Sequence, residues 1–191
     1  LYAQQNPGAE PPRVTWRPFQ LNPQLPAEGM SRQDHVTQKF GAARAKDVYA
    51  RVTRVGVEHG IPFAFERIVR QPNTVAVHSL IALAGAAPQT DGLQDRVKEA
   101  FLCAYFLDGV DLTETENLVA IAAAAGLDRA QVEQCLADPR SRLAVGEEDQ
   151  RGQGQRPADH PPRAFEHEQG QDHAERELQA GEIVDVDDPV D

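Results

Sequence analysis

The sequence predicts a mainly helical chain with a strand near its start and a disordered acidic tail. Apolar residues recur at spacings of three and four over most of residues 31–146, which is typical of amphipathic helices. A short stretch before them alternates apolar and polar residues, as strands do. From Glu147 onward few residues are apolar enough to be buried. We therefore expect three segments: 1–30 with the strand, 31–146 helical, and 147–191 disordered.

The negative charge of the chain is concentrated at its end. The net charge of the 191 residues is −11. Residues 147–191 hold fourteen acidic residues and four arginines, or −10, so the rest of the chain sums to about −1. Binding to a nucleic-acid backbone requires clustered Lys and Arg side chains. We therefore expect no nucleic-acid partner.

We expect neither a membrane span nor a secretion signal. The longest apolar run, Leu118–Leu127, is far shorter than the roughly 20 residues that cross a bilayer. The opening residues, Leu1–Pro12, have neither the basic start nor the apolar centre of a signal peptide. The sequence therefore predicts a cytoplasmic protein with no membrane partner.

The first elements are a strand, a loop and a helix. Val14–Leu21 alternates apolar and polar side chains, and Pro18 restricts this strand to a sheet edge or a strand end. The Pro- and Gly-rich stretch Asn22–Gly29 predicts a loop. Ser31 followed three residues later by Asp34 resembles a capping box, which predicts a helix start.

A second helix is expected up to Gly60, with an apolar stripe at helical spacing: Ala45, Val48, Val52 and Val55. Ile61–Val69 then predicts a short strand or extended segment. Pro72 suits the first turn of the next helix, Asn73–Ala87. This helix is apolar on nearly all sides, so we expect it in the interior.

Three more helices are expected, over Asp91–Leu107, Thr113–Ala125 and Ala130–Ala137. Thr113 with Glu116 forms a capping-box signal for the second of them, and Asp128 caps the third. Pro139 disfavours helical geometry at the residue before it and so ends the third. Helices joined by such short turns predict a bundle.

The two cysteines are expected to be free, reduced thiols. Cys103 and Cys135 lie 32 positions apart on different predicted helices, which fits neither a CxxC motif nor a zinc site. Cys103 lies among apolar and aromatic residues, so we expect a small buried hydrophobe. Cys135 is the more accessible thiol, but no Lys, Arg or His adjoins it to stabilise a thiolate.

Polar and aromatic residues in apolar surroundings are the other candidates for a site. Asn73 at a helix end is most simply a capping group, and His78 a hydrogen-bonded interior histidine. Trp16 is expected in the core. We expect neither a metal site nor a cofactor, because the spacing of the tail histidines is irregular: His160, His167 and His173.

Several stretches resemble FrnE-like members of the DsbA family. The first covers residues 14–23, VTWRPFQLNP, and continues into PAEGM at 26–30. The others are collinear with it: FERIVRQPNT at 65–74, AVHSLI at 76–81, AFLCAYF at 100–106 and ENLVAIAAAAGL at 116–127. The resemblance covers roughly residues 1–146.

The resemblance implies an α/β thioredoxin-like fold interrupted by a helical insertion domain, to which residues 31–146 correspond. It also implies a CxxC pair at the start of the first helix, where the helix N-terminus lowers the thiol pKa, and a cis-proline loop facing that pair. Leu1–Pro7 resembles the end of that first helix, and the chain enters the acidic tail where the family has its cis-proline loop. We therefore expect a chain truncated at both ends, or a reading-frame change near residue 150.

By this resemblance the chain is a thiol–disulfide oxidoreductase family member that is itself inactive. Its partners would be protein thiols and disulfides or a small-molecule substrate, with Asn73 and His78 bordering the substrate groove. One alternative is a glutathione-dependent relative, either 2-hydroxychromene-2-carboxylate isomerase or a kappa-class transferase. The other is a non-catalytic helical interaction module.

Overall fold

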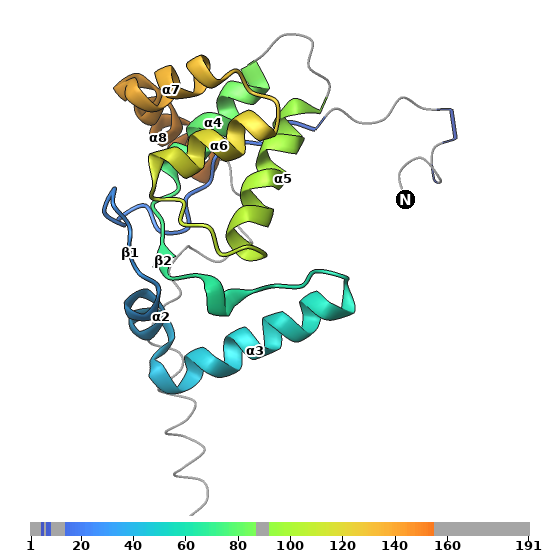
Figure 1. Cartoon of the computed structure of the whole chain (residues 1–191), viewed down its shortest axis with the longest axis vertical. Coiled ribbons are helices and arrows are strands. Elements are labelled where there is room, and N and C mark those ends of the chain that lie inside the picture. Colours follow the sequence, from blue (N-terminus) through green and yellow to red (C-terminus); the bar gives the residue numbers. More distant parts are fainter. Residues whose placement is uncertain (1–4, 6, 9–13, 87–91, 155–191) are drawn as a thin grey trace, which may run out of the picture. The chain divides into compact units, whose positions relative to one another are not determined.

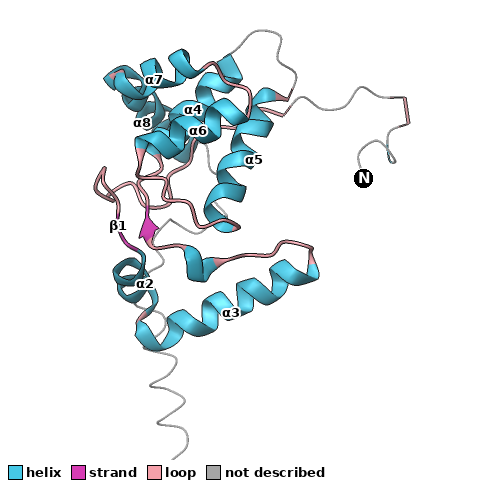
Figure 2. Ribbon diagram, viewed as in Figure 1, coloured by secondary structure: helices cyan, strands magenta, loops and turns pink. Residues whose placement is uncertain are grey.

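The computed structural model describes residues 5, 7–8, 14–86 and 92–154. Figure 1 shows helices α4 to α8 gathered into a bundle, and α2 and α3 joined to it through short strands and a loop. The described β-structure is confined to those two short strands (Figure 2). No helix of the described segments is both long and apolar enough to cross a bilayer.

Helix α4 (Val75–Ala86) is the centre of the bundle. It packs against α5 (Leu93–Phe106), α7 (Arg129–Ala137) and α8 (Pro139–Gly154), while α6 (Thr115–Ala124) packs against both α5 and α7. The expected interior position of the most apolar helix is confirmed.

The core forms where apolar faces of these helices meet. Leu80 of α4, Val97 of α5 and Val132 of α7 are completely shielded from solvent. Burial of each such side chain stabilises the fold by roughly 1.5–3 kcal/mol. The predicted bundle is therefore confirmed in its helices and in its core.

A two-stranded antiparallel sheet joins the start of α2 to the start of α4. Strand β1 (Met30–Ser31) pairs with β2 (Arg70–Gln71), with Met30 opposite Gln71. The Tyr105 hydroxyl of α5 donates to the Arg70 carbonyl at 3.2 Å and so fixes β2 to the bundle. Burial raises the pKa of Tyr105 to about 12.

Helices α2 (Arg32–Phe40) and α3 (Ala42–Glu58) follow β1. The Ser31 hydroxyl caps α2 by accepting from the Asp34 N–H at 3.4 Å, as the capping-box pattern predicts. Local side-chain to backbone bonding therefore sets where α2 begins.

Aromatic rings connect α3 to the bundle. Phe65 lies 4.9 Å from Tyr49 of α3 and 6.1 Å from Phe106 of α5, between ring centroids. Phe63 stacks on Phe65 at 5.1 Å. The Ala64 N–H donates to the Phe106 carbonyl at 2.8 Å, so this extended segment is held by both its backbone and its rings.

The predicted strand Val14–Leu21 is wrong. Residues 14–20 have no regular secondary structure, and their backbone bonds go to side chains. The Trp16 N–H donates to Gln94 Oε1 at 2.9 Å, and Gln94 Nε2 donates to the Trp16 carbonyl at 3.0 Å. Pro18 has no N–H to offer a neighbouring strand. We call residues 14–20 the N-terminal segment below.

The capping box predicted for α6 is also wrong. Helix α6 begins at Thr115 with Glu114 in the N-cap position and no side-chain cap. The Thr113 hydroxyl instead donates to Asp111 Oδ1 at 2.7 Å, in the preceding turn. A threonine hydroxyl close to a helix start can bond either to the first turn of the helix or to the residues before it. Here it bonds to Asp111, which precedes the helix.

The region between α3 and α4 differs from the prediction in two ways. Ile61–Val69 is extended at its ends but contains a single turn of 3₁₀-helix, η1 (Phe65–Arg67). Helix α4 begins at Val75, so Pro72 precedes its first turn rather than lying within it. Pro72 instead follows β2 directly, where its missing N–H interrupts no helical bond.

Pro139 begins a helix that the sequence did not indicate. It is the first residue of α8, a position where the fixed φ of proline is compatible with a helix. The boundary expected at Glu147 lies inside α8, so disorder does not begin there. The rest of the predicted tail, residues 155–191, lies outside the described part of the chain.

Candidate functional site

Asn73 holds the loop after the N-terminal segment against the start of α4. Its Nδ2 donates to the Leu25 carbonyl at 2.7 Å. Its Oδ1 accepts from the Val75 N–H, the first of α4, at 3.0 Å. The predicted capping role is therefore confirmed, and the same amide also ties two distant parts of the chain together.

His78 lies one turn further along α4 and contacts the N-terminal segment. It is hydrogen-bonded to the Phe19 backbone and faces the carboxylate of Asp149 in α8. Burial lowers the pKa of His78, although Asp149 and the bond to Phe19 act in the opposite direction. This is the interior histidine that the sequence predicts, with an acidic neighbour that it did not reveal.

Asp149 completes this polar cluster. Its side chain is only 3% exposed, and its Oδ1 accepts from the Gln20 N–H at 3.0 Å. Gln20 is itself buried. The N-terminal segment is thus bonded to α4 through Phe19 and to α8 through Gln20.

Trp16 is not in the core, contrary to the prediction. It is 40% exposed. Its Nε1 donates to Asp95 Oδ1 at 3.0 Å, and Lys98 Nζ lies 3.9 Å from the centre of its ring. The indole therefore attaches the N-terminal segment to the surface of α5 by a hydrogen bond and a cation–π contact.

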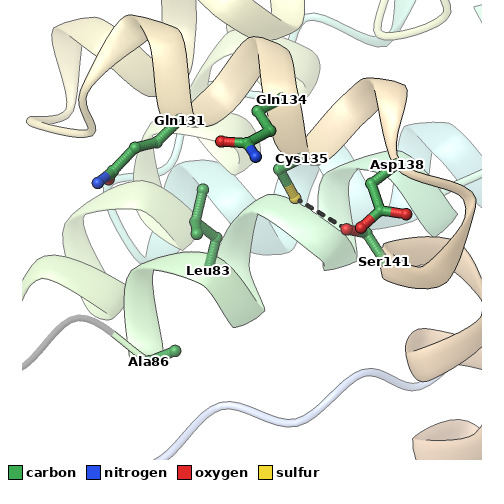
Figure 3. Close-up of a pocket in the computed structure, with 7 residues that line it drawn as sticks. All are labelled: Leu83, Ala86, Gln131, Gln134, Cys135, Asp138 and Ser141. Carbon is green, nitrogen blue, oxygen red and sulfur yellow. Dashed lines mark hydrogen bonds between the residues drawn. The ribbon is translucent and has the colours of Figure 1, made fainter.

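An open cleft of about 460 Å³ lies between α4, α7 and the start of α8 (Figure 3). Seven residues line it: Leu83, Ala86, Gln131, Gln134, Cys135, Asp138 and Ser141. It includes neither Asn73 nor His78. His78 lies elsewhere on α4, and Asn73 lies just before that helix, so neither lines this cleft. No sequence pattern indicated the cleft.

Cys135 contributes the thiol of the cleft. Its Sγ lies 3.5 Å from the Ser141 hydroxyl, the contact drawn in Figure 3, and 3.8 Å from the Ser79 carbonyl. The side chain is half-buried and packs against the apolar core. Cys135 lies near the end of α7, so it does not occupy the first turn of its own helix.

Leu83 and Ala86 form the apolar side of the cleft, and its remaining groups are polar and mostly neutral. Asp138 Oδ1 accepts from the Arg140 N–H at 3.0 Å, so this carboxylate is used to bond the first turn of α8. Gln131 and Gln134 supply amides that can both donate and accept. Such a lining suits hydrogen bonding to a neutral polar ligand or peptide backbone.

Cys103 is half-buried rather than a core residue, contrary to the prediction. Phe101 of the same helix is 2% exposed. Two positions along an α-helix correspond to a rotation of about 200°, so Cys103 faces away from the core. Its Sγ lies 4.0 Å from Glu99 Oε1 on the outer side of α5.

A second open cleft, of about 510 Å³, lies between α2, α3 and the segment around η1. It is lined by Ser31, Arg32, Gln33, Val36, Tyr49, Phe65, Glu66, Ile68 and Val69. The guanidinium of Arg32 lies 4.7 Å from the centre of the Tyr49 ring. In the described ranges, no group of three or more His, Cys, Asp and Glu side chains is arranged to hold a metal ion.

The sequence model of the DSBA-like thioredoxin domain matches residues 2–156. The chain belongs to the DsbA-like thioredoxin family. The thioredoxin-like fold class expected from the sequence is thereby confirmed, in a form that is mostly helical with a small sheet.

A crystal structure of a probable DsbA oxidoreductase from Streptomyces coelicolor is similar to this DsbA-like chain, with a TM-score of 0.63 and 24% sequence identity. The match covers 72% of this chain and 59% of that one, so the chain spans about three fifths of the solved structure. At this level of identity the likeness concerns the fold. No curated protein matches the chain.

For a DsbA-like chain, the arrangement of its two sulfurs is the informative feature. Cys103 and Cys135 lie on α5 and α7, two helices that pack on α4 and α6. Neither thiol is in the first turn of its helix, where the positive end of the dipole stabilises a thiolate. No peptide bond of the described residues is cis.

Asp149 is the residue of the polar cluster that sequence reasoning missed. Its acidic neighbours Glu147 and Glu148 made this stretch resemble the beginning of a disordered tail. The local signal that could have placed Asp149 in a helix is Val145, an apolar residue four positions before it, which is buried in the structure. That spacing places the two side chains on the same face of a helix.

Proposed function

We propose that this chain is an FrnE-type member of the DsbA-like family whose 191 residues have no dithiol oxidoreductase activity of their own. The placement of Cys103 and Cys135 carries the proposal. Exchange of a dithiol with a disulfide passes through a mixed disulfide that a second, adjacent sulfur resolves. Here the two sulfurs have separate neighbours, Glu99 for one and Ser141 for the other.

From membership of the DsbA-like family we infer protein thiols and disulfides as the substrate class. The cleft beside Cys135 supports this inference, since it is open and offers neutral hydrogen-bonding groups. A polypeptide backbone presents matching donors and acceptors. The cleft contains no Lys or Arg that would favour a phosphorylated ligand.

Reduction of insulin by dithiothreitol, followed as turbidity, tests the proposal. We expect the 191-residue chain to leave the rate at its uncatalysed value, because neither thiol has a resolving partner. The C103S/C135S variant serves as the matched control and should give the same rate.

A cysteine-dependent acceleration, present in the chain and absent in C103S/C135S, would overturn the proposal. The circular dichroism melting curves of both proteins should be compared first, so that a difference in folding is not read as a difference in chemistry. The substitutions are small, and both thiols are only half-buried, so we expect similar curves.

A further inference from the structure

Helix α3 has an apolar stripe that is open to solvent. Val52 and Val55 are 40% and 44% exposed, and Val48 is half-buried beside them. Gly56, on the adjoining face, lies against Phe63 so closely that an added Cβ would be 2.5 Å from the ring. The Gly56 face is therefore the packed one, and the valine stripe runs along its edge.

The spacing of these valines is that of a coiled-coil seam. Val48, Val52 and Val55 follow one another at intervals of four and three, as successive d, a and d positions of a heptad do. A stripe confined to a and d positions is narrow and fits one partner helix. With 17 residues, α3 is long enough to present more than two heptads.

The charges beside the stripe indicate which helix would fit. Arg44, Arg51 and Glu58 occupy successive g positions on the flank away from Gly56, and all three are exposed. Within α3, an arginine near the N-terminus and a glutamate at the C-terminus interact unfavourably with the helix dipole. The positive end of the helix dipole lies near Arg44 and the negative end near Glu58, and α3 has no acid in its first turn and no base in its last.

A second α3 running in the opposite direction removes this conflict. In an antiparallel pair, g positions of one helix face g positions of the other. Arg44 then faces the second copy's Glu58 at one end, and the same pair recurs at the other end by symmetry. Arg51 faces the second copy's Arg51 in the middle, which is the one repulsive contact.

We propose that the chain self-associates through α3, as an antiparallel pair of these helices from two copies. In this register Val48 packs against the second copy's Val52, with the Arg44–Glu58 pairs alongside. A seam of one helix pair is at the small end of the interface range, below about 1,200 Å². We therefore expect a reversible dimer with a dissociation constant on the order of micromolar to millimolar.

Sedimentation equilibrium of the full chain over a concentration series tests this directly. We expect a monomer–dimer equilibrium that Val52→Lys abolishes, since it places a charge in the seam. Val57→Lys is the matched control, because Val57 is 67% exposed on another face of the same helix. Monomeric behaviour at every concentration up to about 1 mM, or association that survives Val52→Lys, would overturn the proposal.

Charge exchange tests the orientation. Arg44→Glu and Glu58→Arg each place like charges opposite one another at both ends of the helix pair. Each should raise the dissociation constant of the dimer about tenfold. The double variant restores opposite charges and should restore the dimer. Arg51→Gln should strengthen the dimer, an effect that unfolding cannot imitate. Failure of the double variant to recover dimerisation, or unchanged affinity in Arg51→Gln, would contradict the antiparallel register.

Discussion

One buried histidine, His35, and one half-buried histidine, His78, lie where a positive charge is unfavourable. His35 of α2 is 9% exposed, and its Nδ1 has no hydrogen-bond partner in the described structure. Burial lowers its pKa, and Lys39 and Arg32 lower it further. Burial also lowers the pKa of His78, against the influence of Asp149. In an unfolded chain both imidazoles titrate near 6.5.

These lowered pKa values predict that acid destabilises the fold. Below a pH of about 6.5 the unfolded chain binds protons that the folded chain does not, so the free energy of unfolding falls as the pH falls. We expect urea titrations to give a lower free energy of unfolding at about pH 5.5 than at about pH 7.5. The dependence on pH should be smaller in the His35→Gln/His78→Gln variant.

The exposed His59 provides the control for this experiment. His59→Gln should keep the pH dependence of the unmodified chain, because His59 lies at the solvent-exposed end of α3. An equal loss of pH dependence in His59→Gln, or none in the double variant, would show that the imidazoles of His35 and His78 are not responsible.

Single residues were predictable where their bonds are local. Ser31 bonds three positions away and Asn73 bonds two positions away, and both were identified as helix caps. The bond between Asp149 and Gln20 spans 129 positions, and no sequence pattern encodes such a pair. Cys103 was misjudged because its apolar neighbours in sequence lie on different faces of the helix.

Among the elements, the start of α4 and the loop before the sheet depend on one amide. Asn73→Ala removes the acceptor for the Val75 N–H and the donor to the Leu25 carbonyl together. We expect the free energy of unfolding, from urea titration, to fall by about 1–2 kcal/mol. Gln38→Ala, at an exposed position of α2, should change it by less than about 0.5 kcal/mol. Equal effects would contradict the role given to Asn73.

Helices were predicted better than strands because a helix is defined by bonds within itself. The bundle helices lie close to their expected positions, while the segment Val14–Leu21 has a strand-like sequence and forms no strand. A strand needs a neighbour, and here the side chain of Gln94 bonds the backbone of Trp16 instead. Helix α8 was missed because Pro139 can either end one helix or begin the next.

At the scale of the whole molecule, membership of the DsbA-like family and the proposed lack of dithiol chemistry are compatible. The family is shown over residues 2–156, and more than half of that length is helical. The bundle positions the cleft beside Cys135 without bringing a second sulfur to it. Fold class was therefore accessible from collinear sequence patterns, whereas the surroundings of each thiol required the packing of α4, α7 and α8.

The most direct test of this account is the thiol–disulfide equilibrium of the chain in glutathione buffers of graded redox potential. Rapid alkylation blocks the free thiols, and mass spectrometry then shows which disulfide bonds have formed. We expect Cys103 and Cys135 to be found as free thiols or as separate mixed disulfides with glutathione across the series. A reversible disulfide between Cys103 and Cys135 within one chain, forming at a defined potential, would contradict the account.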